Sequence, residues 1–109
     1  MDRNYVPALS VANRFLQAWQ AEDHEAGLLL LSDSAKQKIS EDRLEKYFQP
    51  GLTTLRAFQV AHGKKLKEGR YTFPVVLFER PSGVFFRTRN VQLLVVQAGK
   101  DDWVVDKLP

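Results

Sequence analysis

The spacing of apolar residues divides the chain into a first part with helical periodicity and a second part with strand periodicity. From Ala8 to Glu22, apolar side chains recur at steps of three and four residues, which predicts an amphipathic helix. Residues 24–31 predict a short and heavily buried second helix, with the carboxylate of Asp23 as its N-terminal cap. The first part of the chain should therefore begin with two helices in close succession.

Polar residues at 32–34 interrupt this pattern and predict a break after the second helix. Ser40 precedes two acidic residues, and this combination is typical of a helix N-terminus, where free backbone N–H groups and the helix dipole favour negative charge. The predicted helix should end before Pro50, because proline disfavours helical backbone in the residue that precedes it. Its apolar edge consists of Leu44, Tyr47 and Phe48.

After Leu52 the apolar period falls to near 2 residues, and β-branched and aromatic residues become frequent. These features predict four strands, at about 53–65, 70–80, 83–97 and 102–108. Turn-forming residues separate them at 67–69, 81–83 and 99–101. Connections this short join antiparallel neighbours, so the strands should form a meander.

Two features should disturb these strands. Pro74 cannot donate a ladder hydrogen bond, so it predicts a bulge or an unpaired side in the second strand. The polar stretch 87–90 should interrupt and bend the third strand. Helices followed by a curved antiparallel sheet make an α+β fold, and the length of 109 residues predicts a single domain over residues 1–109.

Several stretches share a pattern with one known superfamily. They are Phe15–Trp19 with Asp23, residues 28–33, Leu44 with Tyr47 and Phe48, and the final stretch Asp102–Asp106. In these stretches and in the order of its elements, the chain resembles the NTF2-like superfamily of cystatin-like cones, which includes the SnoaL and ketosteroid isomerase-like folds. The resemblance implies that the helices pack in the concave face of a strongly curved antiparallel sheet, and that Trp103, Val104 and Val105 close the core.

Few residues carry recognisable chemistry. The chain has no cysteine, which excludes disulfides, thiolate metal sites and cysteine nucleophiles. The stretch that begins with His24 starts like the zinc motif H-E-x-x-H but has Leu28 in place of the second histidine, and His62 has no second histidine nearby. The sequence also lacks phosphate-binding glycine loops and the G-x-S-x-G elbow. We therefore assign no catalytic residue, no metal and no cofactor.

A ligand pocket in the mouth of the cone is the candidate site that the resemblance implies, because enzymes of the superfamily place Asp, His or Tyr there. Asp106 lies among apolar neighbours, where a buried carboxylate needs a partner, and Arg87 and Arg89 are candidate partners on the adjoining strand. The alternatives are an ion pair on the outer face for Asp106 and core positions for the aromatic residues. The full candidate set is Trp19, Tyr47, Tyr71, Arg87, Arg89 and Asp106.

These features favour a non-catalytic NTF2-like domain that binds a small apolar ligand or another protein. By the same resemblance we expect a homodimer through the sheet, because Val76 and Phe78 give its second face an apolar character. The alternative is an enzyme of the isomerase, cyclase or dehydratase type, in which Asp106 acts with a tyrosine.

The net charge of +3 raises a third hypothesis, nucleic-acid binding. Basic residues gather around the first predicted hairpin, namely Lys64, Lys65, Lys67 and Arg70. A solvated hairpin tip that resists edge-to-edge association explains this cluster more simply, so we expect no nucleic-acid partner.

No apolar run approaches the roughly 20 residues of a membrane span. Because no signal-peptide core follows Met1, we expect a cytoplasmic protein, unless a signal peptide has been removed.

Overall fold

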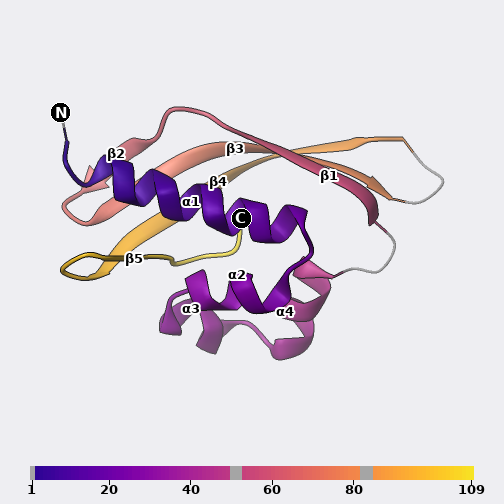
Figure 1. Ribbon diagram of the computed structural model, residues 1–109, viewed down its shortest axis with the longest axis horizontal. Helices are drawn as coiled ribbons and strands as arrows, with labels where there is room; N and C mark the ends of the chain where they lie inside the picture. The colour runs from indigo at the N-terminus through magenta and orange to yellow at the C-terminus, as the bar shows by residue number, and fades with distance from the viewer. Residues whose placement is uncertain (1, 50–52, 82–84) are drawn as a thin grey trace.

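Four helices precede five strands in the computed structural model, which describes residues 2–49, 53–81 and 85–109 (Figure 1). The helices are α1 (Tyr5–Gln20), α2 (His24–Leu30), α3 (Asp33–Lys38) and α4 (Glu41–Phe48). The strands are β1 (Thr53–Val60), β2 (Lys64–Lys67), β3 (Arg70–Pro81), β4 (Arg87–Gly99) and β5 (Asp102–Val105). This order confirms the predicted α+β class.

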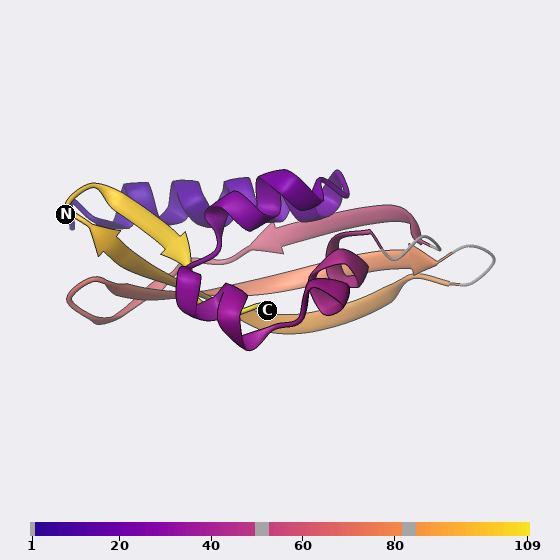
Figure 2. The same cartoon turned by 90° about the horizontal axis from the view of Figure 1, so that it is seen from below.

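The strands pair antiparallel in one curled sheet of order β1-β3-β4-β5, and the short β2 pairs with β3 beyond the end of β1. The central pair, β3 and β4, keeps one register from Arg70 opposite Val96 to Glu79 opposite Arg87. Helix α1 lies in the curve of this sheet, and α2–α4 flank the side on which β5 lies (Figures 1 and 2). The concave packing that the resemblance implies is confirmed for α1.

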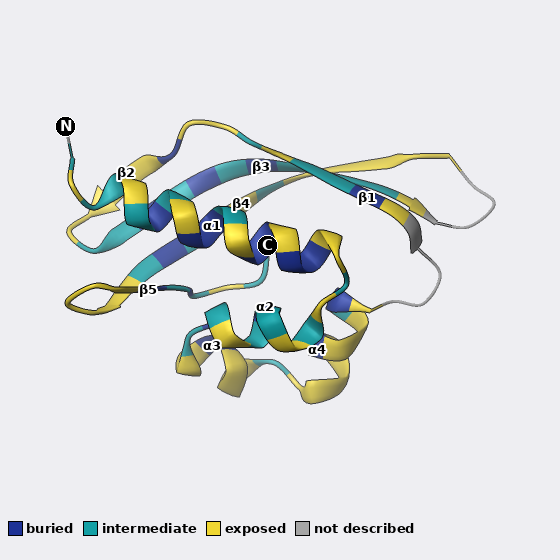
Figure 3. Cartoon of the chain, viewed as in Figure 1, coloured by how far each residue is buried: buried dark blue, intermediate teal, exposed yellow. Residues whose placement is uncertain are grey.

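The core lies between α1 and the concave face of the sheet. The buried stripe of α1 consists of Ala8, Val11, Ala12, Phe15, Leu16, Ala18 and Trp19. Buried positions alternate along the strands facing it (Figure 3), at Tyr71, Phe73, Val75, Leu77, Leu93, Val95, Trp103 and Val105. Trp103 is only 4% exposed, which confirms that the last strand closes the core, whereas Val104 points to the other face and is half-buried.

Side-chain oxygens cap the N-termini of α2, α3 and α4. Asp23, Ser32 and Ser40 each accept a hydrogen bond from the backbone N–H three residues later, at 3.0–3.2 Å. The predicted caps at Asp23 and Ser40 are confirmed. The predicted end of the second helix before residues 32–34 is confirmed, but the predicted number of helices is wrong, because Ser32 caps α3 there and Ala35 of α3 is buried in the core.

The first predicted strand, 53–65, is also wrong, because residues 61–63 divide it into β1 and β2. The divided stretch lies beside Pro74, whose carbonyl oxygen accepts a hydrogen bond from the Ala61 N–H at 2.9 Å. The nitrogen and the carbonyl oxygen of one strand residue point to the same side. The nitrogen of Pro74 therefore faces the gap between β1 and β2, which is the unpaired side that the sequence allows as an alternative to a bulge.

Other boundaries differ from the predicted ones. The polar stretch 87–90 does not interrupt a strand, because β4 begins there and pairs in register with β3, while positions 83 and 84 lie outside the described residues. Strand β5 ends at Val105 rather than at 108, and the carbonyl oxygen of Val105 accepts a hydrogen bond from the Ser32 N–H at 2.8 Å. The heavy burial predicted for α2 is wrong, since Gly27 is its buried residue and Leu29 is 82% exposed.

Within the described part of the chain, no helix has the length and apolar content that a membrane crossing requires.

Candidate functional site

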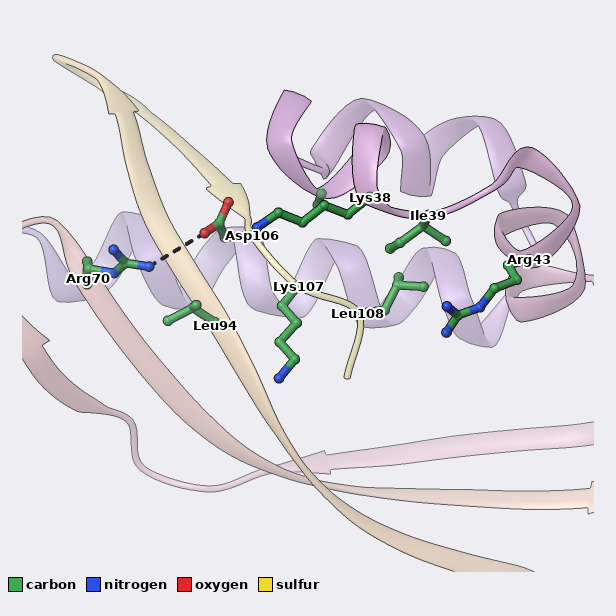
Figure 4. A pocket seen from close by; sticks show the side chains of 9 residues that line it. Lys38, Ile39, Arg43, Arg70, Leu94, Asp106, Lys107 and Leu108 are labelled. Atoms are coloured by element: carbon green, nitrogen blue, oxygen red, sulfur yellow. Dashed lines mark ion pairs between the residues drawn. The ribbon is translucent and has the colours of Figure 1, made fainter.

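A pocket of about 510 Å³ lies where α3 and the start of α4 meet the outer face of the sheet and the segment that follows β5 (Figure 4). We call it the C-terminal pocket. Its lining residues are Ala35, Lys38, Ile39, Arg43, Arg70, Leu94, Asp106, Lys107 and Leu108. Arg70 and Leu94 alternate with the buried Tyr71, Leu93 and Val95, so these two side chains belong to the face of the sheet opposite α1.

Asp106 is the best-anchored polar side chain of this pocket. Its backbone N–H donates to the Leu94 carbonyl oxygen at 3.0 Å, which fixes the residue against β4. The Ser32 hydroxyl donates to Oδ1 at 2.6 Å, and the Arg70 guanidinium lies 3.5 Å from Oδ2. Its partner is thus Arg70 and not Arg87 or Arg89, and both carboxylate oxygens are engaged.

Three further cations line the pocket, Lys38, Arg43 and Lys107, and all three are exposed. Among the residues that the structure describes, their side chains form no ion pair or hydrogen bond. Apolar side chains contribute the rest of the wall, namely Ala35, Ile39, Leu94 and Leu108. The pocket therefore combines an apolar wall with an excess of positive charge.

A second polar cluster lies on the concave face, around the buried Arg56 of β1. The Arg56 guanidinium donates to the backbone oxygens of Trp19 at 2.7 Å, Phe48 at 2.9 Å and Tyr47 at 3.1 Å. It also stacks on the Trp19 ring, and its Nε lies 3.9 Å from a carboxylate oxygen of Glu79. Burial lowers the pKa of Arg56, and the nearby Glu79 opposes that shift.

The Glu79 carboxylate joins this buried arginine to the surface, because its other oxygen accepts a hydrogen bond from Arg89 at 3.3 Å. The hydroxyl of Tyr47 is buried and has no hydrogen-bond partner within the described residues. Burial raises the pKa of Tyr47, so the phenol stays neutral in this cluster. The cluster holds α1, α4, β1 and β3 together. The Glu22 carboxylate also opposes the lowering of the Arg56 pKa, and its buried Oε1 has no hydrogen-bond partner among the described residues.

Tyr71 lies at the far end of the sheet, beside the start of α1. Its hydroxyl donates to the Asp2 carboxylate, and this bond is the main cause that holds the pKa of Asp2 below its ordinary value. Burial, with a smaller effect from the same bond, raises the pKa of Tyr71 to about 12. Tyr5 packs against it and also stacks on His62, which gives that histidine a packing role here.

The six candidate residues thus fall into separate places. Trp19, Tyr47 and Arg89 meet around Arg56 and Glu79, whereas Tyr71 lies near the N-terminus and Asp106 lines the C-terminal pocket. Arg87 begins β4 opposite Glu79 in the ladder and is exposed. Sequence reasoning missed the residues that organise these places, which are Ser32, Lys38, Arg43, Arg56, Arg70 in its role at the pocket, and Glu79.

The basic hairpin cluster is partly neutralised. Lys65 lies 2.6 Å from Glu68 and 3.8 Å from Asp2, and Arg70 pairs with Asp106. As for metals, no three His, Asp or Glu side chains in the described ranges lie close enough together to hold an ion.

No protein-family model and no curated protein sequence matches the chain. Among solved structures, it is similar to a ketosteroid isomerase-like protein from Erwinia carotovora atroseptica, with a TM-score of 0.74 and 13% identity over 98% of this chain and 94% of that chain. A SEC-C motif containing protein from Rhodopseudomonas palustris aligns with a TM-score of 0.67 and 13% identity, over 84% of this chain and 69% of that chain. Likeness at this identity concerns the fold alone. The chain therefore has the NTF2-like, ketosteroid isomerase-like fold that its sequence predicts.

Proposed function

We propose that this chain is a non-catalytic NTF2-like domain that binds a small ligand in the C-terminal pocket. The observation that carries the proposal is the pocket itself, whose volume of about 510 Å³ lies in the range of small-molecule sites. Its apolar wall would bury the body of a ligand, and its charged rim would orient a polar group. Small-ligand sites commonly combine these two features.

The non-catalytic assignment is supported by the positions of the candidate acid and base groups. An acid–base enzyme needs its proton-transfer groups within hydrogen-bond reach of one bound substrate. Asp106 lines the pocket, but Ser32 and Arg70 engage its two oxygens. Neither Tyr47 nor Tyr71, the tyrosines of the enzyme alternative, lines that pocket.

Protein-observed NMR with a mixed set of small neutral and charged compounds tests the proposal. Binding predicts saturable shifts of the Ile39, Leu94 and Leu108 resonances. The variant Leu108→Trp would fill the pocket and should remove those shifts. Leu29→Trp is the matched control, because Leu29 is 82% exposed on α2 and lies outside the pocket. Absence of saturable shifts, or shifts that survive Leu108→Trp, would reject the proposal.

A second candidate function, homodimer formation through the outer face of the sheet, is supported by a separate observation. The outer positions of β1 and β3 include Leu55, Ala57, Pro74, Val76 and Phe78, and no described helix packs over them (Figure 2). Leu55 is 51% exposed and the other four are half-buried. Contiguous apolar surface of this kind is typical of protein interfaces.

Sedimentation over a wide concentration range tests this interface. A dimer through the sheet predicts that Phe78→Glu shifts the chain to a monomer, because the new charge would be buried without a partner. Leu29→Glu, on the opposite part of the molecule, should leave the mass unchanged. A wild-type chain that stays monomeric at the highest concentration would contradict this second candidate.

A further inference from the structure

We infer that the C-terminal pocket selects amphipathic organic carboxylates, meaning molecules with one carboxylate group and an apolar chain or ring. This inference rests on the proposed ligand-binding function and adds the chemical class of the ligand. It comes from the charges on the pocket wall and from the contacts of Asp106, the one acidic residue among the described lining residues.

The charges on the wall do not balance. Four basic side chains line the pocket, at Lys38, Arg43, Arg70 and Lys107, and Asp106 is the one acidic residue among the described lining residues. Arg70 and Asp106 pair with each other, so their charges largely cancel toward a ligand. Three cations without a described partner then remain. An anionic group gains from this surplus, whereas a cationic group is repelled by it.

Asp106 is held by groups other than these three cations. The Ser32 hydroxyl that caps α3 donates to Oδ1, and Arg70 lies by Oδ2. Figure 4 shows Lys38 and Arg70 on opposite sides of Asp106, while Arg43 lies at the other end of the pocket. Lys38 and Arg43 can therefore approach a ligand from two ends of the site.

The apolar wall sets the second requirement. Ile39 and Leu108 lie between Lys38 and Arg43 in Figure 4, and both are half-buried, with one side of each open to the pocket. Leu94 and Ala35 extend the same wall. An apolar chain placed along these residues loses contact with water, and its carboxylate can then reach one of the basic side chains at either end. A small inorganic anion would satisfy the charge but leave the wall uncovered.

Three probes of the same chain length separate the contribution of charge from that of apolar contact. They are octanoate, octanamide and octylammonium, each titrated into the labelled full chain and followed by NMR. The inference predicts that octanoate binds about tenfold more tightly than octanamide, and that octylammonium binds most weakly. Raising the salt concentration should weaken octanoate binding and leave octanamide binding nearly unchanged, because salt screens only the charged interaction.

Variants of the basic lining residues test which side chains select the carboxylate. Lys38→Gln and Arg43→Gln should each weaken octanoate binding about threefold, since both side chains are exposed, and should not change octanamide binding. Lys100→Gln removes the same charge from the turn between β4 and β5, outside the pocket, and serves as the control. A loss in Lys100→Gln equal to that in Lys38→Gln would overturn the inference, because the effect would then follow net charge alone.

The outcomes for the two proposals differ. Equal binding of octanoate and octanamide in the pocket, removed by Leu108→Trp, would overturn carboxylate selectivity and leave the ligand-binding function standing. Failure of all three probes to bind would overturn both. Tighter binding of octanoate that depends on Lys38 and Arg43 would support both.

Discussion

The guanidinium carbon of Arg56 lies 4.6 Å from the centre of the Trp19 ring, which is fully buried beneath it. The same guanidinium donates to the backbone oxygen of Trp19 near the end of α1, and to those of Tyr47 and Phe48 at the end of α4. Carbonyl groups at helix C-termini have no partners within their helix. One arginine of β1 therefore caps two helices and fixes both against the sheet.

Replacing Arg56 with lysine should destabilise the fold strongly. Lysine keeps the charge but has neither the planar group that stacks on Trp19 nor the geometry to reach three carbonyl oxygens. We expect the free energy of unfolding to fall by about 3 kcal/mol, measured by urea denaturation. Arg87→Lys, at an exposed position of β4, should change it by less than about 0.5 kcal/mol. Similar losses in the two variants would contradict the capping role of Arg56.

Gly27 should not tolerate a methyl group, although it lies inside a helix. A Cβ at this position would overlap the ring of Phe48. The gain in helix propensity, about 1 kcal/mol, competes with an overpacking cost of about 1–3 kcal/mol, so Gly27→Ala should lower stability. In a Phe48→Leu background the ring is gone, and the same substitution should then be neutral or stabilising. Thermal denaturation of the four proteins gives this double-mutant cycle, and additive effects would contradict the predicted contact.

Ser32 and Ser40 form a matched pair of helix caps. Each hydroxyl accepts a backbone N–H bond, but only that of Ser32 also donates to Asp106, at 2.6 Å. Ser40→Ala should cost about 1 kcal/mol, the value of a cap. Ser32→Ala should cost about 2–3 kcal/mol, because a charge-assisted bond is lost as well. Equal costs in chemical denaturation would show that the bond to Asp106 adds no stability.

The bond between Tyr71 and Asp2 should make stability depend on pH. Because the folded state lowers the pKa of Asp2, this contribution is complete above its ordinary value of 3.8 and is lost as the pH falls through the lowered value. Because the folded state raises the pKa of Tyr71 from 10.0 to about 12, its contribution is complete below pH 10 and is lost as the pH rises toward 12. The stability difference between wild type and Tyr71→Phe should therefore shrink at both extremes.

Tyr47→Phe separates the loss of stability at high pH from the loss of stability at low pH. Burial raises the pKa of Tyr47, so this variant should lessen the loss of stability at high pH, but it leaves Asp2 and the acid limb unchanged. Because the Tyr47 hydroxyl has no described partner, its removal should not lower stability near neutral pH. Denaturant unfolding at a series of pH values measures both variants. An acid limb that persists unchanged in Tyr71→Phe would refute the role assigned to the bond.

The features of the fold that sequence alone predicts are those set by periodicity and by local capping. The stripe of α1 and the cap at Asp23 follow from residues close to one another in the chain, whereas the burial of Trp103 was implied by the resemblance to the NTF2-like superfamily. The third helix was missed because Ser32 caps a helix as readily as it breaks one, and the choice depends on Ala35 finding a place in the core. Similarly, the division of the first strand depends on Pro74 of its neighbour.

The candidate site was harder to predict because its residues meet through tertiary packing. Arg56, Phe58 and Val60 alternate along β1, so their side chains lie on one face of the strand. The sequence does not show that this face points inward, because β1 has apolar residues on both faces. The pairing of Asp106 with Arg70 depends on how the end of β5 is placed beside the start of β3, and these two residues are far apart in the chain. Pattern reasoning therefore offered an ion pair on the outer face for Asp106, which the structure shows, but it proposed Arg87 and Arg89 as partners in place of Arg70.

A crystal structure of the chain grown with saturating octanoate would show whether the C-terminal pocket is the ligand site. We predict density along Ile39, Leu94 and Leu108, with the carboxylate within hydrogen-bond distance of Lys38 or Arg43 and the pair of Arg70 with Asp106 intact. An empty pocket, or octanoate bound instead on the concave face beside Tyr47, would contradict the function proposed for this domain.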